Sequence, residues 1–99
     1  MWILRTVGDA DGEKIFRLPP STEKTIGRAT GADFIVDAAL VSRVHCRVTS
    51  LPGGELEVQD LESTNGTFVN GTRVTTARIA SGDRLQVGRV ELIALKAAE

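Results

Sequence analysis

The sequence lacks a cysteine pair and a long apolar segment. Its single cysteine, Cys46, cannot form an intramolecular disulfide. Cys46 lies in an apolar alternation with Val44 and Val48, so we expect it to pack in a core. No segment approaches the roughly 18 apolar residues that a membrane-spanning helix needs, and no secretory signal pattern opens the chain. We therefore expect an intracellular protein, cytoplasmic or nuclear, that makes no contact with a membrane.

The chain also lacks an excess of one charge. It has 12 basic and 13 acidic residues and a formal net charge of −1, so no overall field draws it to nucleic acid or to an anionic surface. Any binding of an anion must be local, and we expect no direct contact with nucleic acid. Hydrophobic and charged contents of 41% and 25% are typical of a globular protein. The length of 99 residues predicts a single domain over residues 1–99, which stands alone or is a fragment of a longer protein.

No segment has a convincing helical periodicity. The clearest pattern is residues 44–50, where Val44, Cys46 and Val48 would share one face of a strand and His45 would lie on the other, polar face. Roughly ten short strands separated by turn signals predict an antiparallel sandwich or barrel. The clearest of these expected strands cover residues 2–7, 14–18, 24–27, 34–36, 44–50, 56–59, 73–74, 84–87 and 90–95.

Residues 60–71 contain two Asn-Gly pairs, Asn65-Gly66 and Asn70-Gly71. Asn-Gly favours a type I′ turn, because both residues tolerate the positive φ that this turn requires. The first pair follows Ser63 and Thr64, so hydroxyls, amides and backbone N–H groups gather in one loop, as a site for a small polar or anionic group requires. The alternative is two consecutive hairpin turns that bind nothing.

Two arginines stand at the expected mouths of other loops. Arg28 follows Gly27 at the end of a strand, and Ser42 and Arg43 precede the next clear strand. A guanidinium group matches phosphate oxygens in a bidentate way, and hydroxyl and backbone N–H groups satisfy the remaining lone pairs. If the sheets bring these loops beside Asn65, the rim forms a phosphate site that needs no metal and no cofactor. Taken singly, each residue is more readily interpreted as a solvated arginine or a turn serine, and it is their joint spacing that favours a site.

These motifs, in this order and at this spacing, resemble the forkhead-associated (FHA) domain family of phosphothreonine-peptide readers. The matching pieces are Gly27-Arg28, Ser42-Arg43-Val44-His45, Asn65-Gly66 and the continuation to Asn70-Gly71. The resemblance covers nearly the whole chain, and no position of the motif departs from the family pattern. It implies an all-β fold, an eleven-stranded antiparallel β-sandwich of the FHA/SMAD type. It also implies a phosphothreonine-containing protein or peptide as partner, and a module that acts as a monomer.

The resemblance assigns a role to each motif residue. Arg28 and Ser42 would bind the phosphate directly, and Arg43 and Thr64 would add contacts to it. Asn65 would bind the main chain of the ligand, and its loop would shape a recess for the threonine γ-methyl group. The remaining motif residues would be structural: Gly27, His45, Gly66, Asn70 and Gly71. Among them, the His45 ring would brace neighbouring loops from the polar face of its strand.

In this family, the loop before the Ser-x-x-His element often reads the third ligand residue after the phosphothreonine. Here that loop is residues 38–41, and its side chains are all apolar. An aliphatic surface gains by burying apolar area and leaves a carboxylate unpaired. We therefore expect a preference for Leu, Ile or Val, read by Leu40 with Val41. The alternative is an acidic preference, with the charge supplied by Arg73 or Arg78.

Two other classes of function compete with the binding module. Ser42, His45 and Asp60 suggest a hydrolase, but the sequence has no nucleophile elbow, and residues three apart on an extended chain point to opposite faces. The second rival is a phosphate-independent structural or dimerisation sandwich. The fold does not determine the pathway. An opening Met1-Trp2 is similar to nibrin-type repair adaptors, which suggests a DNA-damage or cell-cycle adaptor.

Overall fold

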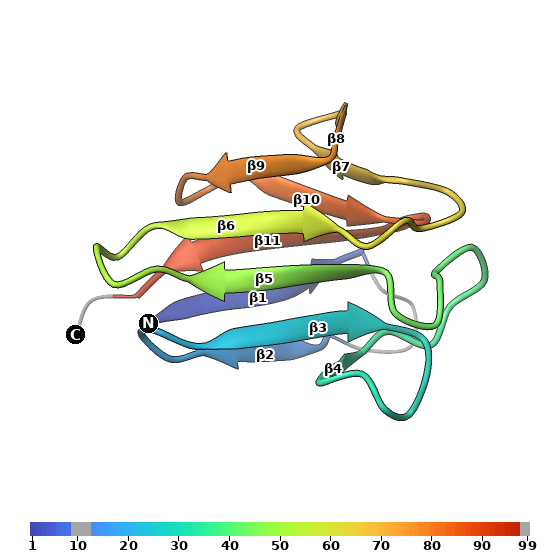
Figure 1. The fold of residues 1–99 in the computed structure, drawn as a ribbon, viewed down its shortest axis with the longest axis horizontal. Helices are drawn as coiled ribbons and strands as arrows, with labels where there is room; N and C mark the ends of the chain where they lie inside the picture. Colours follow the sequence, from blue (N-terminus) through green and yellow to red (C-terminus); the bar gives the residue numbers. More distant parts are fainter. Residues whose placement is uncertain (9–12, 98–99) are drawn as a thin grey trace.

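The chain folds into two β-sheets packed face to face (Figure 1). The computed structural model describes residues 1–8 and 13–97. Within those residues it contains eleven strands and no helix that could cross a membrane. The strands are β1 (Trp2–Val7), β2 (Ile15–Leu18), β3 (Glu23–Gly27), β4 (Phe34–Ile35), β5 (Cys46–Ser50), β6 (Leu56–Asp60), β7 (Thr67–Val69), β8 (Thr72–Val74), β9 (Thr76–Ile79), β10 (Arg84–Val87) and β11 (Val90–Lys96).

One sheet has six strands in the order β2-β1-β11-β10-β7-β8, and the other has five in the order β4-β3-β5-β6-β9. The expected eleven-stranded sandwich is therefore confirmed, with one correction. The sheets are not wholly antiparallel, because β4 runs parallel to β3. The connection between these strands turns back alongside β3, and the Asp33 carboxylate fixes it by accepting a hydrogen bond from the Thr25 backbone N–H at 2.9 Å.

Alternating apolar side chains fill the space between the sheets. On β6, Leu56 and Val58 are fully buried, and on β10 the same holds for Leu85 and Val87. Cys46 also lies in this core, where burial raises the pKa of its thiol to about 12. A thiol so far from ionisation is not a nucleophile near neutral pH, and the expected packing role is confirmed.

The predicted strand at residues 44–50 begins later, at Cys46. The expected faces were also wrong at its start, because Val44 is 44% exposed and His45 is completely buried. The reason is that both ring nitrogens of His45 find partners in loops. A buried polar group costs little when its hydrogen bonds are satisfied, so tertiary contacts override the local alternation of hydropathy.

The two Asn-Gly pairs have different structures. Asn70 and Gly71 have φ values of 49° and 83° and join the paired strands β7 and β8, as the type I′ prediction requires. Asn70 also ties this hairpin to β10, because its Oδ1 accepts a hydrogen bond from the Arg84 backbone N–H at 2.9 Å. Asn65-Gly66 instead lies in the connection from β6 to β7, which belong to different sheets. The interpretation of two consecutive hairpins is therefore wrong for the first pair.

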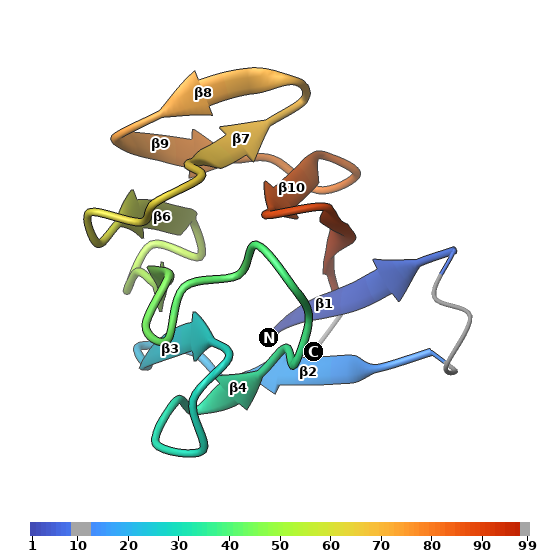
Figure 2. The same cartoon turned by 90° about the vertical axis from the view of Figure 1, so that its right-hand side faces the viewer.

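Strand direction places three connections at the same end of the sandwich. They are the β3–β4, β4–β5 and β6–β7 loops, on the right in Figure 1. Figure 2 looks onto this end, and the β4–β5 loop, drawn in green, crosses its middle. Segments that are distant in the sequence therefore converge on one small surface.

Candidate functional site

A hollow of about 420 Å³ opens where these three loops meet. Four residues expected to bind phosphopeptide lie around it, and Arg43, which follows Ser42, is exposed beside it. The residues that line the hollow are Arg28, Ala39, Leu40, Val41, Ser42, Thr64 and Asn65. The structure thus brings together side chains as far apart in the chain as Arg28 and Asn65, which are separated by 37 positions.

Arg28 is held at the rim by its neighbours in the β4–β5 loop. Its Nε donates to the Val41 carbonyl at 3.0 Å, and its backbone N–H donates to the Ser42 carbonyl at 3.0 Å. No other hydrogen bond or ion pair of the Arg28 side chain occurs within the described residues. The terminal N–H groups of the guanidinium are therefore available to an anion.

Ser42 connects the β4–β5 loop to the β6–β7 loop. Its Oγ accepts a hydrogen bond from the Thr64 backbone N–H at 3.1 Å. Its own backbone N–H donates to Nδ1 of His45 at 3.0 Å. The hydroxyl proton is left to donate to a ligand, because a hydroxyl can donate and accept at the same time.

His45 is buried beneath the same two loops and bonds to both. Because Nδ1 accepts from Ser42, the ring proton is on Nε2, which donates to the Gly66 carbonyl at 2.8 Å. The ring contacts the Ser42 backbone rather than its hydroxyl, and Asp60 bonds to Ser63 and Thr67 rather than to the ring. The nucleophile, base and orienting acid of a hydrolase are therefore not assembled here.

Asn65 and Leu40 form a second connection between the loops. Nδ2 of Asn65 donates to the Leu40 carbonyl at 3.0 Å, which leaves Oδ1 of the amide free to accept from a ligand. Leu40 has a φ of 72°, a left-handed conformation that is uncommon for leucine. Gly88 lies against it, since a Cβ at Gly88 would be 2.8 Å from the Leu40 carbonyl oxygen.

The side chains of the specificity loop separate into two groups. Leu40 is 43% exposed and lines the hollow, as a residue that reads a ligand must. Val41 is 3% exposed and packs in the core. Val41 nevertheless borders the hollow, and its backbone carbonyl accepts from Arg28, so its part in reading the ligand stays a prediction.

Sequence reasoning missed the network that shapes the β6–β7 loop. Oδ1 of Asp60 accepts from the hydroxyls of Ser63 at 2.5 Å and Thr67 at 2.7 Å, and Oγ of Ser63 accepts from the Gly66 N–H at 3.0 Å. Burial raises the pKa of the Asp60 carboxyl, but the hydrogen bonds from Ser63 and Thr67 outweigh burial, so the pKa lies below its ordinary value. The spacing of Asp60 and Ser63, three residues apart, was the available signal.

Some arginines of the described residues pair with acidic side chains and others do not. Within the described residues, no ion pair involves Arg28 or Arg43. Arg78, on β9, pairs with Glu55 at 2.7 Å and Glu57 at 3.4 Å and does not line the hollow. The other arginines with acidic partners are Arg5, Arg47 and Arg84. Arg28 and Arg43, in the loops at the site end, therefore carry positive charge that is not held in an ion pair within the described residues.

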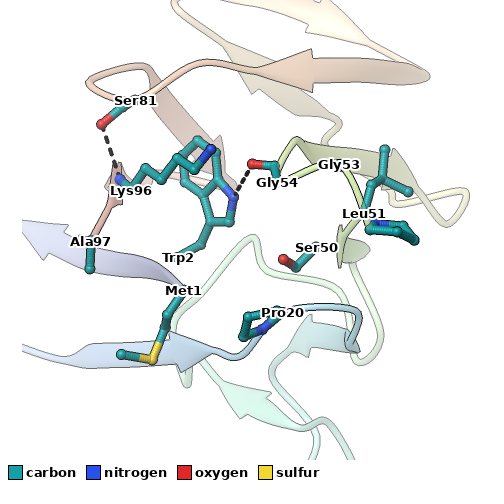
Figure 3. Close-up of a pocket in the computed structure, with 11 residues that line it drawn as sticks. Met1, Trp2, Pro20, Ser50, Leu51, Gly53, Gly54, Ser81, Lys96 and Ala97 are labelled. Carbon is teal, nitrogen blue, oxygen red and sulfur yellow. Dashed lines mark hydrogen bonds between the residues drawn. The ribbon is translucent and has the colours of Figure 1, made fainter. Parts of the chain in front are cut away.

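A larger hollow lies at the opposite end of the sandwich and has a different character. It measures about 680 Å³, and Lys96 is the one charged side chain that lines it. Figure 3 shows the Trp2 indole, which lines this hollow and whose Nε1 donates to the Gly54 carbonyl at 3.1 Å. Chemistry rather than volume identifies the site, because convergent donors and unpaired cations occur at the smaller hollow. Within the described residues, no cluster of His, Cys, Asp or Glu could hold a metal ion.

Comparison with known families agrees with this geometry. The model of the FHA domain matches residues 24–88, which is more than half of the chain. The chain belongs to the FHA-domain family. The structure of this FHA domain is similar to that of the FHA domain of CT664 from Chlamydia trachomatis, with a TM-score of 0.92, 19% identity and 98% of both chains covered. It is also similar to the FhaA FHA domain complexed with the intracellular domain of Rv3910, with a TM-score of 0.84, 31% identity and coverage of 95% of this chain and 99% of that chain.

Two relatives with related sequences are bacterial. The ABC transporter ATP-binding/permease protein Rv1747 of Mycobacterium tuberculosis is 42% identical over 76 residues, which are 77% of this chain and 9% of that protein. The glycogen accumulation regulator GarA of Mycolicibacterium smegmatis is 38% identical over 88 residues, which are 89% of this chain and 54% of that protein. The chain thus spans about half or less of the length of these relatives.

These relatives do not support the expected DNA-damage role or a nuclear location. Their names refer to transport and to glycogen accumulation. The Met1-Trp2 opening gives no support either, because Trp2 is 3% exposed and serves the core. The similarity to repair adaptors rested on a side chain whose role here is packing.

The Asp60 network gives a prediction for stability against pH. A carboxyl whose folded pKa lies below its unfolded pKa stabilises the fold above the unfolded value, and that stability is lost as the pH falls through the folded pKa. We expect Asp60→Asn to lower the free energy of unfolding at pH 7 by about 1–3 kcal/mol, as loss of hydrogen bonds to a charged group does. Denaturant unfolding from pH 7 to 3 should also show a smaller decline for the variant than for the wild type.

Asp33→Asn is the matched control, because hydrogen bonds from Thr25 lower the pKa of this fully exposed carboxyl too. Its effect at pH 7 should be smaller, since solvent screens it. An Asp60→Asn protein as stable as the wild type at pH 7, with a parallel decline in acid, would contradict the role given to this network.

Proposed function

We propose that this FHA domain is a phosphothreonine-dependent binding module that recruits phosphorylated proteins or peptides and performs no catalysis. The observation that carries the proposal is the unpaired guanidinium of Arg28 facing the same hollow as the Ser42 hydroxyl. A phosphate group has a charge of about −1.5 to −2 at pH 7 and offers three strong acceptor oxygens. Fixed donors around a hollow without acidic residues suit that group.

The pre-organisation of the loops supports the same proposal. Ser42 and Asn65 are each held by a hydrogen bond across the two loops, at 3.1 Å and 3.0 Å. A site whose donors are already fixed loses less conformational entropy when the ligand binds. We infer that Arg28 and Ser42 hold the phosphate, that Arg43 and Thr64 add to it, and that Asn65 binds the ligand main chain.

The relatives suggest the setting in which the module works. GarA is named a glycogen accumulation regulator, a protein of Corynebacterium efficiens that is 34% identical over 88 residues is named an oxoglutarate dehydrogenase inhibitor, and the FhaA domain was solved with the intracellular domain of another protein. We infer that the domain acts inside the cell, as a monomeric recruiting part of a regulatory or transport protein. Its ligand would be a protein phosphorylated on threonine.

The first test removes the phosphate contacts. Charge-assisted hydrogen bonds contribute about 1.5–3 kcal/mol each. Arg28→Ala, which removes several N–H donors, should weaken phosphothreonine-peptide binding by at least about 100-fold, and Ser42→Ala, which removes one hydroxyl donor, by at least about ten-fold, both measured by calorimetry. Arg43→Ala should weaken it less. Arg17→Ala is the control, because this exposed arginine on β2 also lacks an ion pair within the described residues and pairs in register with Ile3, away from the site.

Equal affinity of the wild type and a folded Arg28→Ala protein would refute the phosphate site. A wild-type protein that binds no phosphothreonine peptide but forms a dimer in sedimentation measurements would favour the structural or dimerising alternative. The phosphopeptide should bind without any measurable phosphatase or esterase activity.

The second test compares phosphothreonine with phosphoserine. The two differ by one methyl group, which contributes on the order of 1 kcal/mol in a fitted pocket. We expect the phosphothreonine peptide to bind roughly five-fold more tightly or better, because the recess beside Asn65 takes the methyl group. Titration of matched peptides measures the ratio, and a ratio of one would mean that no such recess exists.

The third test concerns the third residue after the phosphothreonine. Leu40 is the exposed aliphatic side chain at the hollow, so an oriented peptide library should be enriched in Leu, Ile or Val at that position. Leu40→Arg should shift the enrichment towards Asp and Glu. Leu40→Asn is the control for backbone conformation, because asparagine tolerates the left-handed φ of this position and should lose the aliphatic preference without gaining the acidic one. Enrichment of Asp or Glu by the wild type would contradict this assignment.

A further inference from the structure

Arg73 lies beside the candidate site without lining its hollow. It is an exposed residue of β8, and it pairs in register with Phe68 across the β7–β8 hairpin. Its side chain reaches back to the β6–β7 loop, where a Cβ on Gly66 would be 2.8 Å from Nε and 3.1 Å from Cζ of Arg73. The guanidinium therefore lies against Gly66, one residue from Asn65.

The charge of Arg73 has no acidic partner. Within residues 1–8 and 13–97 no ion pair includes it, although Glu62 belongs to the same β6–β7 connection. Arg84, on the same sheet, is by contrast paired with Glu91 at 3.3 Å. Arg89 lies apart, because it lines a separate hollow together with Asp37 and Glu91. Within the described residues, Arg73 is thus an unpaired cation at the border of the site.

A count of charge shows that this cation exceeds what one phosphate needs. A phosphate carries about −1.5 to −2 at pH 7, and Arg28 and Arg43 already supply two positive charges beside the hollow. Arg73 adds a third beside Gly66. A ligand that carried only the phosphate would leave this charge uncompensated, whereas a second anionic group on the ligand would pair with it.

We propose that Arg73 forms a second anion subsite, which takes an acidic or phosphorylated side chain of the ligand that passes over Asn65 and Gly66. This inference rests on the proposed phosphothreonine-binding function. The shared chemistry is an oxyanion in reach of a guanidinium fork, either a carboxylate or a second phosphate. The cation already lies at this place before the ligand arrives, because the Arg73 side chain lies against Gly66.

Glycine at position 66 is needed for two reasons, its turn conformation and the room that it leaves for Arg73. Its φ of 89° favours glycine, but its missing side chain also leaves the space in which the guanidinium lies. The carbonyl of the same residue accepts from His45 at 2.8 Å. Gly66 therefore connects the buried brace of the loops with the exposed cation.

The test is a double-mutant cycle between the protein and the peptide. One parent phosphothreonine peptide with neutral neighbours is compared with variants that carry Glu, Gln or phosphoserine at each of the three positions on either side. Each peptide is titrated by calorimetry into the wild type, Arg73→Gln and the control Arg17→Gln. Arg73→Gln keeps a long polar side chain and removes the charge.

We expect one or two positions at which Glu binds about five-fold more tightly than Gln to the wild type, as a partly exposed ion pair allows. Phosphoserine at these positions should gain on the order of ten-fold, because its charge is larger. Both gains should disappear in Arg73→Gln, persist in Arg17→Gln and shrink at high salt. The parent peptide should bind the wild type and Arg73→Gln equally well.

Three results would overturn the inference. The first is equal affinity of the Glu and Gln peptides for the wild type at every position. The second is a gain in affinity from Glu that Arg73→Gln leaves intact. The third is a loss of affinity in Arg73→Gln that is the same for all peptides, which would mark a purely structural contact. In each case binding of the parent peptide that still depends on Arg28 would leave the proposed function standing. Failure of every phosphothreonine peptide to bind would instead reject the proposed function and the inference with it. Coupling at the third position would support Arg73 while contradicting the assignment of Leu40.

Discussion

The imidazole of His45 joins two loops whose bonded residues lie far apart in the sequence. It accepts from the Ser42 N–H at 3.0 Å on one side and donates to the Gly66 carbonyl, 21 residues away, at 2.8 Å on the other. The ring is fully buried, yet both nitrogens have partners, so its burial leaves no polar group unsatisfied. The ring thereby holds Ser42 in one loop and, through Gly66, the neighbour of Asn65 in the other.

Close approach of backbones completes the same end of the sandwich. A Cβ on Gly27 would overlap the Arg43 carbonyl, and one on Gly88 would lie 2.8 Å from the Leu40 carbonyl oxygen. Backbone atoms cannot give way as the end of a flexible side chain can, so larger residues at either glycine would push the β4–β5 loop outwards. The site is therefore shaped by missing side chains as well as by hydrogen bonds.

The arginines of the described residues differ in whether they pair with an acid. Arginines on the outer faces of the sheets pair with glutamates, as Arg47 does with Glu23 at 3.2 Å, whereas Arg28 and Arg73 near the loops have no acidic partner within the described residues. Exposed ion pairs of the first kind contribute little to stability. A near-zero net charge therefore coexists with a local concentration of positive charge, which an anionic ligand would neutralise.

The sequence by itself determined the features that depend on neighbours along the chain. The alternation that buries Leu56 and Val58 and the hairpin at Asn70-Gly71 were predictable, because side-chain period and the tolerance of positive φ are local properties. The order of the family's motifs also pointed to the loops that meet at the hollow. Only the tertiary structure decided that His45 turns inward and that Arg73 lies against Gly66. Those outcomes depend on partners in other loops, which the hydropathy of a single strand does not encode.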